Sequence, residues 1–123
     1  MFTLEQVNEI HDELGKASTL AAYLRALRAI GVEKSESFIT DGHTVHHGKD
    51  GHTVVTPPAH EVFTIAETSN RERFLECLEE TNYQKMSKGL ADSGVEKWTF
   101  DTHDLTIIYY DKAGNELLKE DIK

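Results

Sequence analysis

The sequence of 123 residues contains one cysteine, two prolines and one tryptophan. Because Cys77 has no second cysteine in the chain to pair with, it fits a protein of a reducing compartment. No run of about eighteen apolar residues occurs, so we expect no membrane-spanning helix. The first residues lack a basic stretch followed by an apolar run, so we expect no signal peptide. These absences predict a cytoplasmic protein without a membrane partner.

Positive charge is also scarce. The chain has 13 Lys and Arg against 22 Asp and Glu, which gives a formal net charge of -9. Duplex DNA and anionic lipid would repel such a surface, and Arg25 with Arg28 is the only basic cluster that we identify. We therefore expect no nucleic-acid partner. The length and the 38% hydrophobic content predict one folded domain spanning residues 1–123.

The most informative feature of the sequence is a repeat. The run Gly-Val-Glu-Lys at positions 31–34 recurs at positions 94–97, which is an offset of 63 residues. Between the windows 31–51 and 94–114, seven of 21 positions are identical, where chance gives roughly one. Helix ends and turns can recur for physical reasons alone, but that explains the glycines and not the Glu-Lys pair. We interpret the repeat as an internal duplication.

Apolar spacing and turn residues predict the same elements in each half. Thr3, with Gln6 three residues later, is a capping box, and Asp41-Gly42 is typical of a two-residue hairpin turn. The predicted helices cover residues 3–14, a segment from 18 or 19 to 30, one helix capped by Ser69, and one that ends at 93–94. The predicted strands cover about 33–40, 43–48, 52–56, 96–101, 105–110 and 116–120, with a further short strand at 61–65.

These elements define an α+β fold class. Each half consists of two helices followed by a three-stranded antiparallel meander, and the pseudo-repeats cover about residues 3–56 and 69–120. We expect the two meanders to form one antiparallel sheet, or two packed sheets, with helices covering a face.

The two halves differ where one of them has acquired another use. The matched positions are Ser35/Trp98, Ser37/Phe100, His46/Tyr109, His47/Tyr110 and His52/Asn115. Since side chains alternate along a strand, Ser35 and Ser37 share a face. One interpretation is a polar pocket lined by both serines and one of the two adjacent histidines. The other is that this face of the first half is exposed to solvent.

Five of the seven histidines fall between His43 and His60. His46 and His47 point to opposite strand faces, and His43 lies about 13 Å from His47 along one face, too far to share a zinc ion. His47 and His52 are the one pair that can converge, but no metal-binding spacing accompanies them. We therefore expect no metal, and surface histidines that titrate near neutral pH are the alternative.

No motif in the sequence names a reaction. Cys77, on an amphipathic helix, is interpreted as a buried thiol, since a nucleophilic cysteine needs exposure and a lowered pKa. Ser35 or Ser37 with a nearby histidine imitates a nucleophile–base pair, but no nucleophile elbow or third member accompanies it. We expect no catalytic residues and no cofactor.

Four motifs carry a resemblance to a known family. They are DGHTV at 41–45, IA with TSN at 65–70, SGVEKW at 93–98 and YYDKAGNE at 109–116. Together they resemble small bacterial and prophage-encoded proteins of unknown function that are often labelled phage envelope proteins. The resemblance implies a prophage origin and brings no activity and no catalytic residues with it.

Three functional hypotheses follow. We favour a non-catalytic binding or interaction module that binds a protein partner or a second copy of itself, as in a homodimer. Its contact surface would lie in the histidine-rich first half, with the candidate binding residues Ser35, Ser37, His43, His46, His47 and His52. The second hypothesis is a phage-derived structural or accessory protein. The third is a small-ligand-binding protein or enzyme that uses a pocket at Ser35, Ser37, His46 and His47.

Overall fold

The structure is a computed structural model that describes residues 2–15, 17–80 and 82–122. In this part of the chain it contains four α-helices and a six-stranded antiparallel sheet, which confirms the predicted α+β class. The helices are α1 (Leu4–Leu14), α2 (Leu20–Ala29), α3 (Arg71–Cys77) and α4 (Tyr83–Asp92). Short 3-10 turns lie at Ala17–Thr19 and Lys49–Gly51. No described helix has both the length and the apolar character needed to cross a membrane.

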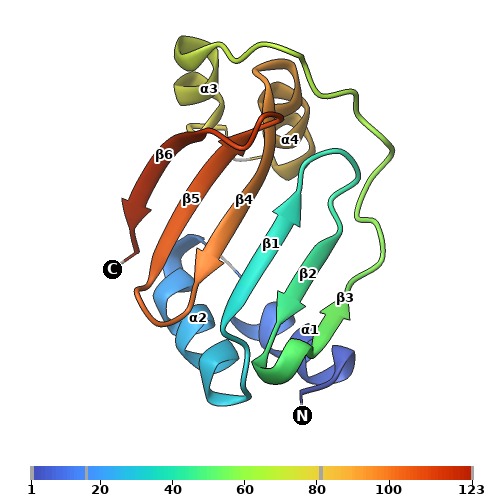
Figure 1. Ribbon diagram of the computed structural model, residues 1–123, viewed down its shortest axis with the longest axis vertical. Helices are drawn as coiled ribbons and strands as arrows, with labels where there is room; N and C mark the ends of the chain where they lie inside the picture. Colours follow the sequence, from blue (N-terminus) through green and yellow to red (C-terminus); the bar gives the residue numbers. More distant parts are fainter. Residues whose placement is uncertain (1, 16, 81, 123) are drawn as a thin grey trace.

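The strands pair in the order β3-β2-β1-β4-β5-β6 (Figure 1). Their bounds are β1 (Lys34–Phe38), β2 (Thr44–His47), β3 (Thr53–Val55), β4 (Val95–Asp101), β5 (Thr106–Asp111) and β6 (Glu116–Asp121). Each half of the chain therefore contributes three neighbouring strands, and the halves meet where β1 pairs with β4. The two meanders form one sheet, which is the first of the two predicted arrangements.

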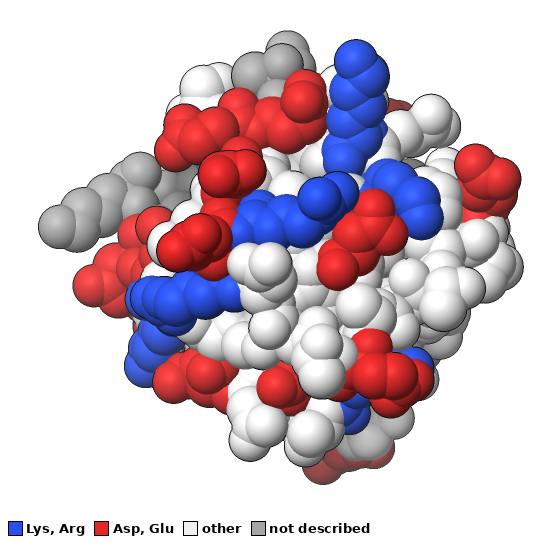
Figure 2. Space-filling view, turned by 90° about the horizontal axis from the view of Figure 1, so that it is seen from above, with Lys and Arg blue, Asp and Glu red and all other residues white. Residues whose placement is uncertain are grey.

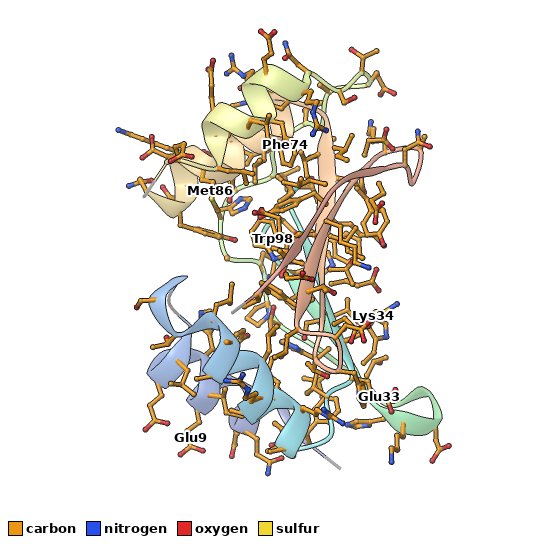
Figure 3. The ribbon with its side chains drawn as sticks, turned by 90° about the vertical axis from the view of Figure 1, so that its left-hand side faces the viewer. Glu9, Glu33, Lys34, Phe74, Met86 and Trp98 are labelled. Carbon is orange, nitrogen blue, oxygen red and sulfur yellow. The ribbon has the colours of Figure 1, made fainter. Side chains whose placement is uncertain are left out.

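All four helices lie on one face of this sheet (Figure 3). Two apolar clusters fill the space between the helices and the sheet, and the partly buried Phe100 packs against both. The cluster under α1 and α2 contains Phe2, Val7, Tyr23, Leu24, Leu27 and Val32. The cluster under α3 and α4 contains Ile39, Ile65, Phe74, Leu90, Ala91, Val95, Ile107 and Tyr109. The opposite face of the sheet carries no helix and is the one turned to the viewer in Figure 1.

The helix ends follow from local chemistry. Thr3 caps α1 in the predicted capping box, with the Gln6 backbone N–H donating to the Thr3 hydroxyl and the Gln6 side chain accepting from the Thr3 N–H. After α2 and α4 the chain turns at Gly31 (φ +105°) and Gly94 (φ +88°), a conformation that glycine adopts without a Cβ penalty. The cap predicted at Ser69 is wrong by one residue, because the Asn70 side chain accepts the hydrogen bond from the Arg73 N–H.

Two predicted details of the sheet are wrong. The β1–β2 connection is longer than a two-residue turn at Asp41-Gly42, since β1 ends at Phe38 and β2 begins at Thr44. Residues 61–65 form no strand of the sheet. The Phe63 N–H donates to the Thr40 carbonyl (2.6 Å) and the Thr40 hydroxyl donates to the Phe63 carbonyl (2.9 Å). These bonds tie the segment to the end of β1 without extending a ladder.

The junction of the halves is reinforced at both ends of the β1–β4 ladder. The Ile39 N–H donates to the Glu96 carbonyl, and the Thr102 N–H donates to the Glu33 carbonyl. The Thr102 hydroxyl, which is 1% exposed, also lies 2.8 Å from the Val32 carbonyl and 2.9 Å from the Glu33 carbonyl. This buried hydroxyl therefore ties the turn after β4 to the start of β1.

We predict that Thr102→Val lowers the free energy of unfolding by about 1–2 kcal/mol, because it leaves two buried carbonyls without that donor. The matched control is Thr106→Val. Thr106 is 3% exposed, and its hydroxyl has no partner among the described residues. The same isosteric change there should be neutral or stabilising. Urea denaturation of both variants measures the difference, and equal losses of stability would contradict this account of the junction.

Candidate functional site

The six residues predicted to bind a partner do not form one site. Ser35, Ser37 and His46 lie on the helix-covered face of the sheet. There the Ser35 Oγ is 2.7 Å from the His46 Nδ1, and the two residues are only 1% and 2% exposed. The Ser37 hydroxyl is 2.9 Å from the Thr44 hydroxyl. These side chains satisfy one another inside the molecule.

Burial sets the protonation state of His46. Desolvation lowers its pKa to about 4, with smaller contributions from the charges of His11 and His47. The ring is therefore neutral at physiological pH and can accept or donate one hydrogen bond at Nδ1. A neutral imidazole next to a serine hydroxyl has the chemistry of a general base, but at 2% exposure no substrate reaches it in this conformation.

The other three predicted residues lie elsewhere. The His47 Nε2–H donates to the Glu36 carboxylate (2.7 Å) on the uncovered face of the sheet. The His43 ring bonds to the Asp41 carboxylate in the β1–β2 turn and stacks on Phe38. The His52 Nε2–H donates to the Phe2 carbonyl (2.9 Å). His47 and His52 thus have separate partners. Within the described residues no group of three potential metal ligands gathers.

The uncovered side of the sheet, which we call the open face, is organised in three rows that cross the strands. The register of the strand pairs defines them. In the orientation of Figure 1, the upper row contains Phe38, Lys97, Tyr110 and Glu116. The middle row contains Val55, Val45, Glu36, Thr99, Ile108 and Lys119. The lower row contains Thr53, His47, Lys34, Asp101, Thr106 and Asp121.

Glu36 is the electrostatic centre of the open face. Its carboxylate accepts hydrogen bonds from His47 and from the Lys97 ammonium group, and its side chain is only 14% exposed. Burial by itself raises the pKa of Glu36, but the hydrogen bonds from Lys97 and His47 outweigh burial and lower it on balance. A carboxylate this well shielded is fixed in place and leaves no free charge at the middle of the face.

Aromatic rings surround the same lysine. The Lys97 Nζ lies 5.7 Å from the centre of the Phe38 ring and 5.5 Å from the centre of the Tyr110 ring. The Phe38 ring in turn stacks on His43 at 4.6 Å between ring centres, with only 7° between the ring planes. These contacts order the upper row as a rigid surface of aromatic and charged groups.

The residues of the open face were mostly missed from the sequence. Only His43 and His47 were predicted there, whereas Phe38, Val45 and Ile108 were not. A usable signal existed in β5, where Thr-Ile-Ile-Tyr-Tyr is apolar or aromatic at successive positions. Such a run is typical of a strand that is buried on both faces, while only one face of β5 is covered in the monomer.

A surface groove of about 590 Å³ lies between residues 61–64 and α4, away from these residues. Two of the cations that line it are already paired, because Arg73 and Lys88 both contact the Asp92 carboxylate at 3.4 and 3.2 Å. Figure 2 views the molecule from this end and shows acidic and basic side chains interspersed. The groove therefore offers no concentrated charge, and the open face is the stronger candidate.

The fold and the open face together define a small one-sheet α+β protein without an exposed catalytic constellation among its described residues. Residues 8–121 match the family described as "Protein of unknown function (DUF1398)", and the chain belongs to that family. No curated protein is similar enough to count as a match.

We predict that His46 makes the folded protein less stable in acid. The unfolded chain binds the proton with a pKa near 6.5 and the folded chain with a pKa of about 4, so the unfolded state holds more protons between these values. Stability is therefore lost as the pH falls from 6.5 to about 4, by roughly 3 kcal/mol at the lower end. His46→Gln should flatten this part of the curve of unfolding free energy against pH.

The control is His103→Gln, which changes an exposed histidine in the turn after β4. Urea denaturation at a series of pH values gives the slope for each variant. Equal slopes for the His46 variant and the unmodified protein would show that the buried ring does not carry the effect.

Proposed function

We propose that this protein is a non-catalytic binding module whose contact surface is the open face of its sheet and whose partner is a protein. The carrying observation is the composition of the middle row, where Val45, Val55 and Ile108 lie on a face that no helix covers. A one-sided antiparallel sheet ordinarily presents polar side chains to solvent. Val55 is 54% exposed, so apolar surface is available for contact.

The arrangement around the middle row has the anatomy of a protein interface. An apolar centre is flanked by two rows that carry charged, hydroxyl and aromatic groups, as in the polar rim of known interfaces. Phe38 and Tyr110 supply the aromatic side chains that contribute strongly to binding energy. The charges nearest the centre, Glu36 and Lys97, pair with each other, so a partner need not neutralise them.

The geometry supports a binding module over a ligand pocket or an enzyme. The alternative function requires Ser35, Ser37, His46 and His47 to line one cavity. Ser35 and His46 are buried beneath helices, while His47 bonds to Glu36 on the other side of the sheet. The open face, in contrast, presents its side chains together and already ordered.

We further propose that the chain is a single domain that arose by internal duplication. Support comes from strand register. With the offset of 63 residues, each of the four β1–β2 pairs, from Lys34↔His47 to Ser37↔Thr44, corresponds to a β4–β5 pair, from Lys97↔Tyr110 to Phe100↔Ile107. The β1–β4 ladder is also unchanged when its halves are exchanged with that offset, since Lys34↔Asp101 becomes Phe38↔Lys97.

The ends of two helices and the backbone conformation show the same offset. α2 covers Leu20–Ala29 and α4 covers Tyr83–Asp92, so both ends shift by 63 residues. Positive φ values occur at Gly31 and Gly94, at Gly42 and Leu105, and at Gly51 and Gly114. The non-glycine Leu105 at φ +53° is costly, and a retained ancestral turn explains why it stands there.

Origin and location complete the proposal. The four motifs at 41–45, 65–70, 93–98 and 109–116 support a prophage origin through their resemblance to proteins labelled phage envelope proteins. The single cysteine supports the cytoplasm as the place of action. A phage-associated role would then depend on protein contacts, which is the activity that the open face supports.

Site-specific photo-crosslinking in cells tests the proposed contact surface. We predict that p-benzoyl-phenylalanine in place of Val55, on the open face, gives discrete protein adducts after irradiation. The same group in place of Val62 is the matched control, because Val62 is 77% exposed and lies outside the sheet. Adducts should appear at position 55, disappear when untagged protein is overexpressed, and be absent at position 62. Adducts at neither position, or equal adducts at both, would contradict the proposal.

A further inference from the structure

We infer that the occupant of the open face is a second copy of this chain, packed face to face with a two-fold axis parallel to the central strands. The inference rests on the proposed function and adds the identity and orientation of the partner. The axis runs between β1 and β4, so the first half of one copy lies over the second half of the other. Two sheets that pack in this way lie about 10 Å apart.

Charge and shape match across this axis. In each row, a β1 residue of one copy lies over the β4 residue of the other. Phe38 therefore meets Lys97 of the second copy in a cation–π contact, and Lys34 meets the carboxylate of Asp101 of the second copy. In the middle row, Val45 on β2 meets Ile108 on β5 of the second copy. Each of these contacts occurs twice, because the axis exchanges the copies.

The other face-to-face two-fold arrangement is unfavourable. An axis along the middle row would place every middle-row residue over its own counterpart, so Glu36 would face Glu36 and Lys119 would face Lys119 of the second copy. It would also bring Glu116 of the upper row over Asp121 of the lower row. Juxtaposed like charges cost several kcal/mol in a desolvated interface. The axis parallel to the strands produces none of these contacts.

Sheet twist confines the interface to its centre. Aligned sheets cross at about 30°, so strands far from the axis diverge. Contacts of β1, β2, β4 and β5 therefore dominate, while the edge strands β3 and β6 contribute less. Each copy carries a net charge of -9, and the resulting repulsion is screened over about 10 Å at 0.1 M salt. We expect association to strengthen as salt is raised from low concentration.

The first measurement uses the unmodified full-length protein. Sedimentation velocity between about 10 μM and about 1 mM should show a monomer–dimer equilibrium, which corresponds to a weak, reversible complex. Amide NMR shifts over the same range should move for Val45 and Ile108 and stay fixed for Val62. A monomer at every concentration would overturn the inference. Adducts at position 55 that contain a different protein would then leave the proposed function standing, so the two failures are distinguishable.

The second measurement tests the orientation with charged variants. Val45→Lys and Ile108→Asp each place an unpaired charge opposite an apolar side chain, and each should weaken the dimer at least tenfold. An equimolar mixture of the two variants should recover dimer as the heterodimer, because the new lysine then faces the new aspartate. Within one chain these positions are separated by β1 and β4, so recovery cannot arise inside a monomer.

Val62→Lys is the control, since it adds the same charge to an exposed valine away from the sheet, and it should leave the dimer unchanged. Circular dichroism and thermal melting identify any variant that fails to fold, and the NMR titration of the unmodified protein then decides the inference. Failure of two folded variants to form the heterodimer would overturn the proposed axis, because an axis along the middle row places Val45 over Val45.

Discussion

The antiparallel pairing of β1 with β4 is the interaction on which this structure depends. It is the only ladder among the described strands that joins the two halves of the chain. Because the strand order runs outward from this pair in both directions, it fixes a six-stranded sheet with all four helices on one side. Thr102 reinforces one end of the junction through two backbone carbonyls. The uncovered face, and with it the proposed function, follows from this connection.

The same constraint explains why the serines and His46 are buried. The helix layer covers the face that they occupy, so they must satisfy one another, as the Ser35–His46 hydrogen bond does. Matched positions in the two halves also exchange volume. The first half combines a small Ser35 on the strand with Leu24 on the helix, whereas the second half combines Trp98 with a small Ser87. Cores keep their packing when total volume is conserved in this way.

Much of the architecture could be predicted from the sequence, because it depends on local signals. Apolar spacing predicts the helices, the Thr3 capping box gives the start of α1, and the glycines at 31 and 94 give the ends of α2 and α4. Alternation correctly placed Ser35 and Ser37 on one face. Alternation does not say which face the helices cover, since that depends on long-range pairing. The predicted binding site was therefore divided between the two faces. The strand predicted at 61–65 failed for a related reason, because the backbone of Phe63 bonds to Thr40 outside the ladder.

The central claim is that the open face, and not the helix layer, contacts the partner. Methyl cross-saturation NMR tests it directly, with a deuterated, methyl-labelled protein mixed with unlabelled, protonated protein. The account predicts that methyl signals of Val45, Val55 and Ile108 lose intensity on irradiation of the unlabelled copies, while those of Leu24 and Leu90 in the helix-covered core do not. Loss confined to residues of the helix layer, or no loss at any methyl group of the open face, would contradict it.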